Sequence, residues 1–357
     1  LMVRIVLCCL LVSLTSTGFS QFYSRTHLDS LENALVEQSG TTRINTLLLL
    51  SETYASFHLD TAANYADMAK SESRKLGYEW GYCKSYFCEG KINYEKAPLT
   101  EVGLILKKCS DWFTAHGYEH DAVQSDMLYA PVLSDIEGSD AAIQVAELTL
   151  ERAKKLGDYN LLGKAWFNME LLKPRGVSSY DYEGSIDSAL VYFRLAKDTA
   201  NLLYVNLHNQ LSRMHTPESI EYCSQSFETV NKWGNNRLAT LASDYIGLGY
   251  AVAYKFDSTE TYCQNSLEIA DKYGSLRSQQ KSFKILGYAY YRIDSLNVSL
   301  NYFEKSLAVA DKMQNRKEMC RQLNQIGTIH LKLGDFEKGA KSKLEIIEEA
   351  EKMGDYY

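Results

Sequence analysis

Small and apolar residues recur along the chain in blocks that share one pattern and end near a glycine. "SLEIADKYG" at residues 266–274 is echoed by "SLAVADKMQ" at 306–314 and by "IIEEAEKMG" at 346–354. A glycine just after such a block is favoured as the C-terminal cap of a helix. The pattern therefore predicts helices that end at a fixed interval along the chain.

Two series of glycines share this interval. Gly77, Gly117 and Gly157 are forty residues apart at the ends of blocks, and Gly234, Gly274 and Gly354 continue the period, with Gln314 in the remaining place. Upstream of the later members lie Gly247, Gly287 and Gly327, again forty apart. Two glycine series at one period indicate a repeat array, whereas a length of 357 residues would otherwise suggest two or more compact domains.

The motif inside each unit resembles that of tetratricopeptide repeat (TPR) proteins. "FKILGYAY" at 283–290 matches W-x2-L-G-x2-Y with Phe283 in place of Trp, and Ser299 and Phe303 match the later A-x3-F portion. The first unit has alanines in its small-residue places, at Ala62, Ala66 and Ala69. The resemblance implies an all-α fold, a right-handed superhelical solenoid of antiparallel helix pairs. In it helix A carries the L-G element and lines the concave surface, and helix B ends at the junction glycine.

The resemblance covers residues 41–357 as about eight units of forty residues. Each unit would bury its apolar face against its neighbours only. The pattern is weakest over 172–220, where "LKPRGVSSYDYEG" and "HTPES" are typical of loops. Units in that stretch are expected to depart from even spacing.

The amino terminus differs from the rest of the chain. Arg4 precedes an apolar run at 5–14, and Gly18 and Ser20 occupy the −3 and −1 positions for cleavage before Gln21. Residues 1–20 therefore read as a signal peptide, and the run is shorter than the roughly 20 residues of a membrane-spanning helix. We expect an exported, periplasmic or extracytoplasmic protein, with an amphipathic capping helix in 21–40 and no membrane span beyond the signal peptide.

An exported chain with this opening is similar to the periplasmic half of Bacteroidota-type sensor proteins. In those proteins tetratricopeptide repeats precede a membrane helix and a histidine kinase or helix-turn-helix output domain. After Gly354 the letters "DYY" match "GDYN" at 157–160, where a new unit opens. The expectation is a front fragment of a longer signalling protein, truncated at its C-terminus; a stand-alone periplasmic adaptor or assembly protein is the alternative.

Charge narrows the expected partner. The net charge of −7 argues against a nucleic-acid binder, because phosphate contacts need a basic surface. In the family, ligands meet the concave face of helix A, where basic and aromatic residues recur in this chain. These features predict a protein or peptide partner and favour an acidic one, held by charge-assisted bonds. The candidate binding residues are Lys84, Lys164, Lys281, Lys284, Tyr288, Tyr291, Arg292, Arg321, Asn324, Thr328 and Lys332.

One motif suggests different chemistry. His116, Glu119 and His120 spell H-x-x-E-H, a zinc-peptidase pattern, and make a zinc-dependent hydrolase the remote alternative. Gly117 interrupts the helix that the two histidines would need, and Glu119 repeats Glu79 of the preceding unit. The motif therefore reads as a repeat junction, and no catalytic residue, cofactor or metal is predicted.

The six cysteines beyond the signal peptide show no paired spacing and are expected to be buried thiols. Carbohydrate uptake is a third possible role, because helical repeat proteins also serve nutrient complexes, but the chain lacks a convincing lipoprotein cysteine.

Overall fold

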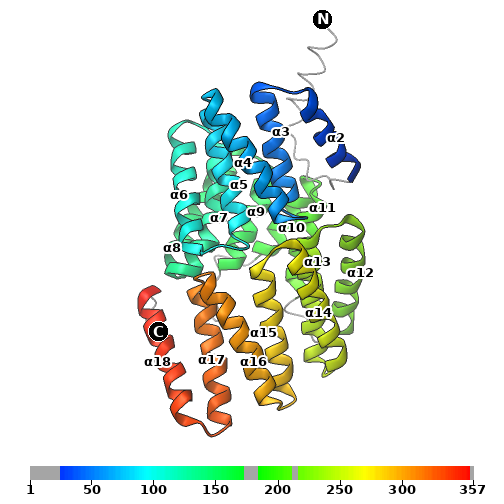
Figure 1. The fold of residues 1–357 in the computed structure, drawn as a ribbon, viewed down its shortest axis with the longest axis vertical. Coiled ribbons are helices and arrows are strands. Elements are labelled where there is room, and N and C mark those ends of the chain that lie inside the picture. Colours follow the sequence, from blue (N-terminus) through cyan, green and yellow to red (C-terminus); the bar gives the residue numbers. More distant parts are fainter. Residues whose placement is uncertain (1–24, 173–183, 211–215, 354–357) are drawn as a thin grey trace, which may run out of the picture.

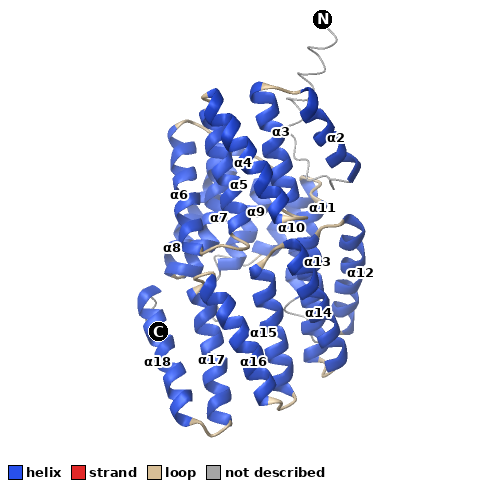
Figure 2. Cartoon of the chain, in the orientation of Figure 1, coloured by secondary structure: helices blue, strands red, loops and turns tan. Residues whose placement is uncertain are grey.

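A computed structural model describes residues 25–172, 184–210 and 216–353, and every regular element in these ranges is a helix (Figures 1 and 2). The predicted signal peptide and residues 354–357 lie outside the described residues. The helices are α2 (Arg25–Glu37), α3 (Gly40–Tyr54), α4 (Leu59–Leu76), α5 (Glu79–Asn93), α6 (Leu99–Ala115), α7 (Glu119–Glu137), α8 (Ser139–Leu156), α9 (Tyr159–Leu172), α10 (Ser185–Leu195), α11 (Thr199–Asn209), α12 (Pro217–Trp233), α13 (Asn236–Val252), α14 (Phe256–Tyr273), α15 (Leu276–Arg292), α16 (Leu296–Lys312), α17 (Arg316–Lys332) and α18 (Phe336–Met353).

After α2, the helices form consecutive antiparallel pairs. Each odd-numbered helix from α3 to α17 is a helix A, and it packs against the even-numbered helix B that follows it. Helices A also contact the next helix A, as in α3–α5, α7–α9 and α13–α15, so they form the inner wall of the coil. The all-α solenoid of helix pairs predicted from the repeat is confirmed. The shortest helices, α10 and α11 with 11 residues each, lie in the stretch where the repeat is weakest.

The junction glycines adopt the backbone conformation that their spacing predicts. Gly77, Gly117 and Gly157 have φ of 69°, 78° and 69°, the left-handed region that ends a helix with little cost only for glycine. Gln314 fills the glycine place between α16 and α17, and it adopts the same conformation with φ of 52°. The turn geometry is therefore kept even where the glycine is absent.

The glycines inside helices A allow helix B to approach closely. A Cβ at Gly287 would lie 3.0 Å from the Phe303 ring, and one at Gly247 would lie 2.9 Å from the Cys263 sulfur. Phe303, Cys263 and Cys223 are fully buried. The expectation of buried thiols is confirmed for five of the six cysteines, which are buried, whereas Cys320 is partly exposed.

Helix α2 covers the first pair at the amino-terminal end. Leu28 and Leu35 are buried, and the Glu32 carboxylate accepts hydrogen bonds from the Tyr54 and Tyr65 hydroxyls, both at 2.8 Å. The helix lies within the range predicted for a capping helix.

Contacts between units are not limited to nearest neighbours. The coil completes a turn and stacks on itself, so that α3–α9 form the upper tier and α13–α18 the lower tier in Figure 1. The side chain of Asn236 donates to the Phe57 carbonyl 179 residues away, and the Ser275 hydroxyl donates to Glu95 180 residues away. One turn therefore takes about four and a half 40-residue units. The expectation that each unit packs only against its neighbours was wrong, because the pitch brings successive turns into contact.

We call this contact the interturn seam. Its upper side is the loops after α3 and α5 and the end of α7, and its lower side is the junctions before α13, α15 and α17. Backbone N–H groups cross it from Arg237 to the Ser56 carbonyl at 3.2 Å and from Arg277 to the Glu95 carbonyl at 3.1 Å. A third crosses from Leu99 to the Met313 carbonyl at 2.8 Å. The two turns are thus joined by directional bonds at regular intervals.

Arg277 makes the densest set of seam contacts. Its Nε donates to the Tyr94 carbonyl at 3.2 Å, its guanidinium carbon lies 3.8 Å from the Tyr94 ring centroid, and Nη1 lies 3.5 Å from Asp135. Asp135 also accepts from the Asn315 amide at 3.2 Å. This arginine therefore ties the start of α15 to two units of the first turn.

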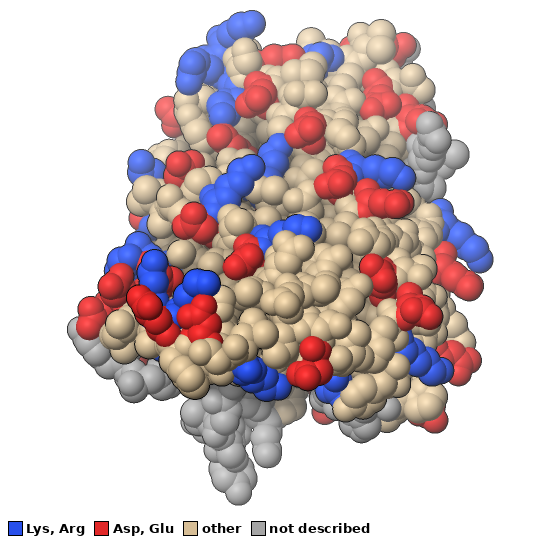
Figure 3. All heavy atoms as spheres, turned by 60° about the horizontal axis from the view of Figure 1, so that its bottom comes forward, with Lys and Arg blue, Asp and Glu red and all other residues tan. Residues whose placement is uncertain are grey.

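The outer surface carries scattered charges of both signs, as Figure 3 shows for one face. In the ranges that the structure describes, none of the helices combines the length and apolar character needed to cross a membrane.

Replacing Arg277 with alanine should loosen the interturn seam without disrupting the helix pairs. We expect Arg277→Ala to lower the free energy of unfolding by about 2 kcal/mol, because it leaves a half-buried carboxylate with one partner fewer. Hydrogen exchange should accelerate at the seam amides of Arg237 and Leu99 and stay unchanged inside α5 and α15. Arg194→Ala, on the exposed face of α10, is the control. Seam amides that exchange as in the wild type would contradict a cooperative seam.

Candidate functional site

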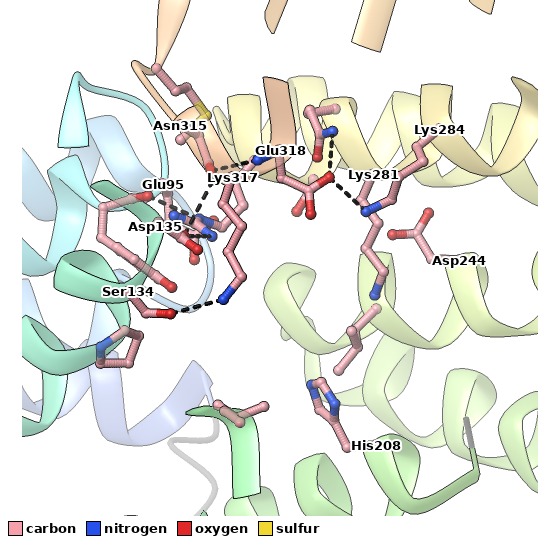
Figure 4. Close-up of a pocket in the computed structure, with 18 of the residues that line it drawn as sticks. Glu95, Ser134, Asp135, His208, Asp244, Lys281, Lys284, Asn315, Lys317 and Glu318 are labelled. Carbon is pink, nitrogen blue, oxygen red and sulfur yellow. Dashed lines mark hydrogen bonds and ion pairs between the residues drawn. The ribbon is translucent and has the colours of Figure 1, made fainter. Parts of the chain in front are cut away.

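A cavity of about 930 Å³ lies inside the coil, behind the interturn seam. Figure 4 shows it with side chains from the first turn on one side and from the second turn on the other. Ser134 and Asp135 come from the end of α7, Asp244 from α13, and Lys281 and Lys284 from α15. Because helices A form the inner wall, their inward residues provide most of the lining. The cavity exists only where the two turns meet.

One wall of the cavity is centred on the Glu318 carboxylate of α17. Lys284 approaches it at 2.9 Å, the Gln280 amide donates at 3.2 Å and the Gln322 amide at 3.1 Å; Arg321 is also ion-paired with it. Burial alone would raise the pKa of Glu318, but the charges of Lys284 and Arg321 outweigh it and lower the pKa to about 2. The Glu318 carboxylate therefore pairs with both bases, and the three groups together carry one net positive charge.

Lys281 and its neighbours form a second part of the lining. Its ammonium nitrogen lies 3.9 Å from the Tyr245 ring centroid, and burial lowers its pKa to about 8, opposed by the charge of Asp244. Burial raises the pKa of Asp244, whose carboxylate accepts from Ser282 at 2.6 Å. Burial, with the charges of Lys281 and Arg237, lowers the pKa of His208 to about 3. The imidazole is therefore neutral at physiological pH.

The seam itself closes the side of the cavity that faces the first turn. The Lys317 ammonium donates to Ser134 at 2.8 Å, and Asn315 and Arg277 both reach Asp135. A molecule in the cavity would therefore touch both turns.

The remaining wall is largely apolar. Its apolar residues are Phe167, Leu171, Leu172, Ile186 and Leu241, and the polar Glu170 and Asn209 also belong to the lining. An apolar wall facing a few fixed polar groups is typical of a ligand pocket.

The candidate residues predicted from the sequence fall into two groups. Lys281, Lys284 and Arg321 line the cavity together. Lys84 lies on the inner face of α5, buried between Glu52 at 3.0 Å and Asp121 at 2.9 Å, so its charge is already paired. Lys164, on α9, is partly buried, and burial lowers its pKa.

The other candidates lie outside the cavity lining. The Tyr288 ring packs edge-on against Phe303, with ring centroids 5.1 Å apart. The Lys332 ammonium lies 4.1 Å from the Tyr291 ring, and the Arg292 guanidinium lies 4.3 Å from the Tyr254 ring.

At the carboxyl-terminal end, the Asn324 carbonyl accepts from the Thr328 hydroxyl at 2.7 Å and from the Lys343 ammonium at 3.2 Å. The structure therefore does not bring these residues together with the lysines of the cavity.

Several inward polar residues link consecutive helices A. Lys84 bonds Asp121, Asn160 bonds Asp198 and Gln280 bonds Glu318, each pair being 37 or 38 residues apart. These side chains join one unit to the next along the inner wall. A predicted base such as Lys84 therefore has an acid of the next helix A as its partner.

The H-x-x-E-H residues lie at a repeat junction, as the period predicts. His116 follows α6 and stacks on Trp112 with ring centroids 4.1 Å apart, whereas Glu119 and His120 begin α7. Glu119 binds Arg152 at 2.6 Å, and His120 approaches Asp158 at 3.3 Å. In the described part of the chain, no group of three or more His, Cys, Asp or Glu residues is placed to hold a metal ion.

Sequence reasoning missed the seam and the acidic lining. Arg237 and Arg277 are forty residues apart, and each follows a junction glycine by three positions, so the repeat alignment contained a sign of the seam arginines. His208, Asp135 and Asp244 belong to the lining only because the coil closes, which no local pattern reveals.

Comparisons with known proteins bear on the fold. No family model matches the sequence. No curated protein matches it either. Among solved structures, the APC/C hetero-tetramer Cut9–Hcn1 gives a TM-score of 0.54 at 12% identity over 90% of this chain and 57% of the other. A Rap protein complexed with competence and sporulation factor gives 0.42 at 14% identity, over 95% and 83% of the two chains.

Aspartyl phosphate phosphatase F from Bacillus subtilis gives a TM-score of 0.37 at 14% identity, over 91% of this chain and 80% of the other. Together with the eight described helix pairs, the likeness to the Cut9–Hcn1 structure defines this chain as a TPR-like helical repeat protein.

The Glu318 cluster should make stability depend on acid pH. With a pKa of about 2, below its ordinary value of 4.5, Glu318 contributes stability that is fully present above pH 4.5 and is lost as the pH falls toward 2. Glu318→Gln should lower the free energy of unfolding by about 2 kcal/mol at pH 7, because Lys284 and Arg321 lose their anion. The difference from wild type should shrink between pH 4.5 and 2.

Chemical denaturation at pH 7, 4 and 2.5 measures this effect. Glu268→Gln, at an exposed position of α14, is the control and should change little at any pH. If the free energies of unfolding of wild type and Glu318→Gln differ by the same amount at all three pH values, the assigned ion cluster is excluded.

Proposed function

We propose that this chain is an exported helical repeat scaffold that holds a peptide, or an extended segment of a partner protein, inside its coil. The observation that carries the proposal is the cavity of about 930 Å³, with one apolar and one charged wall. Its volume falls within the roughly 300–1,000 Å³ common for ligand pockets. In this role the chain binds and does not catalyse.

The proposed biological setting is the sensory, periplasmic part of a signalling protein. A ligand in the cavity would contact Ser134 or Asp135 of the first turn and Lys281 or Glu318 of the second. It would therefore favour one spacing of the turns, which is how binding shifts a two-state equilibrium. A stand-alone periplasmic adaptor would use the same cavity without passing the change on.

Filling the cavity should abolish peptide binding. Leu241 lies on the apolar wall, and Leu241→Trp would place an indole in the space that a ligand side chain needs. We expect wild-type protein to enrich sequences from a library of random dodecapeptides displayed with free carboxyl termini, and the variant to enrich none. Leu331→Trp, at an exposed position of α17, is the control and should behave as wild type. Equal enrichment by the Leu241→Trp protein would place binding elsewhere.

Export is tested separately. Residues 1–24 fused to mature alkaline phosphatase should give phosphatase activity in a bacterial periplasm, because the apolar run at 5–14 directs export. The same fusion with Leu10→Asp and Leu11→Asp, which breaks that run, should be inactive. Activity confined to the cytoplasmic fraction would overturn the exported setting and leave the binding proposal intact.

A further inference from the structure

Lys281 differs from the other bases that line the cavity. Lys284 is paired with Glu318, Arg277 with Asp135, and Lys317 donates to Ser134. Among the described residues, the Lys281 ammonium makes neither a hydrogen bond nor an ion pair, and its nearest recorded contact is the Tyr245 ring at 3.9 Å. Figure 4 shows it reaching into the cavity on the side opposite Ser134. In the described part of the chain, this cation thus faces the open space without an anion in direct contact with it.

None of the described groups packed around Lys281 supplies an anion in direct contact with it. The charge of Asp244 on α13 favours the ammonium, but this carboxylate accepts from the Ser282 hydroxyl and forms no ion pair with Lys281. Glu318 of α17 is shared by Lys284 and Arg321. His208 of α11 is neutral, because its pKa is lowered to about 3. Cys223 of α12 is a neutral thiol, because burial raises its pKa to about 12.

A partly buried ammonium without a direct partner is unfavourable, and an anion bound in the cavity would stabilise it. The carboxylate is the anion that a peptide can supply, at its C-terminus or on an Asp or Glu side chain. The lining also includes the apolar residues Phe167, Leu171 and Ile186, which suit an apolar side chain next to that carboxylate.

We propose that Lys281 binds a carboxylate of the peptide in the cavity, and that an adjacent apolar residue of the peptide packs against Phe167, Leu171 and Ile186. This inference rests on the proposed peptide-binding function and specifies its ligand class. Lys284 and Arg321 act indirectly, since they hold Glu318 away from Lys281.

The charge of Lys281 also sets how binding responds to pH. Its pKa is lowered to about 8 by burial, so the ammonium loses its proton as the pH rises from 7 to 9. A bound carboxylate favours the ammonium, and binding therefore takes up a proton in this range. Glu318 and His208, with pKa values of about 2 and 3, and Cys223, at about 12, titrate outside it. Asp244 has a raised pKa, and Lys284 is a further charge facing Lys281.

Lys281→Met tests the assignment with little risk to folding. Methionine keeps the length of the side chain and its contact with the Tyr245 ring, and it removes a buried charge, so stability at pH 7 should not fall. Lys272→Met, at an exposed position of the outer helix α14, removes the same charge and is the matched control.

The experiment selects random dodecapeptides with free carboxyl termini on the wild-type protein. The enriched peptide is then synthesised with an acetylated amino terminus and either a free or an amidated carboxyl terminus. We expect Lys281→Met to lower the affinity for the free-acid peptide by about tenfold or more, because a charge-assisted hydrogen bond is lost. Wild-type affinity should fall between pH 7.5 and 9.5, and that of Lys281→Met should not.

The outcomes separate this inference from the proposed function. Loss of affinity on amidation assigns the carboxylate to the peptide C-terminus; retained affinity, abolished by Asp→Asn or Glu→Gln in the peptide, assigns it to a side chain. If peptides bind wild type and Lys281→Met with equal affinity but do not bind Leu241→Trp, the role of Lys281 is overturned and the proposed peptide-binding function stands. If the wild-type protein enriches no peptide beyond the Leu241→Trp protein, both fall.

Discussion

The interturn seam is the contact on which the rest of this structure depends. Helix pairs that pack only on their neighbours would give an open coil whose inner face is exposed to solvent. Here the junctions before α13, α15 and α17 bond the loops after α3 and α5 and the end of α7, and Arg277 joins Tyr94 to Asp135. Because this contact closes the coil, the inward faces of helices A surround a cavity in which charged side chains are partly shielded from bulk water.

The sequence predicted the fold from two kinds of glycine. Gly117 and Gly157 end helices in the left-handed conformation, and Gly287 admits the Phe303 ring beside helix A. Both roles are local, so a single sequence reveals them. The closure of the coil is not local: it depends on the small rotation between units summed over about four and a half of them. No pattern near Phe57 or Glu95 shows that Asn236 and Ser275 will meet them.

The same limit explains the outcome for the candidate site. Lys84, Lys284 and Arg321 were identified by their place on helix A, but each is paired with Asp121 or Glu318 from the next or the same helix A. The acids follow Lys84 and Lys284 by 37 and 34 residues, about one unit, and so could have been noticed in the repeat alignment. That Lys281 has no such acid could only be found from coordinates.

The stacking of one turn on the next also restricts how this protein can change in length. An ordinary solenoid can gain or lose a unit anywhere, because each unit contacts only those beside it. In this coil, duplication of a unit between α5 and α13 would rotate the second tier by roughly 80°, one unit's share of a turn that takes about four and a half units. Arg277 would then meet a different loop. The number of units between the tiers is therefore part of the binding site's architecture, and growth by duplication is open only at the two ends of the array.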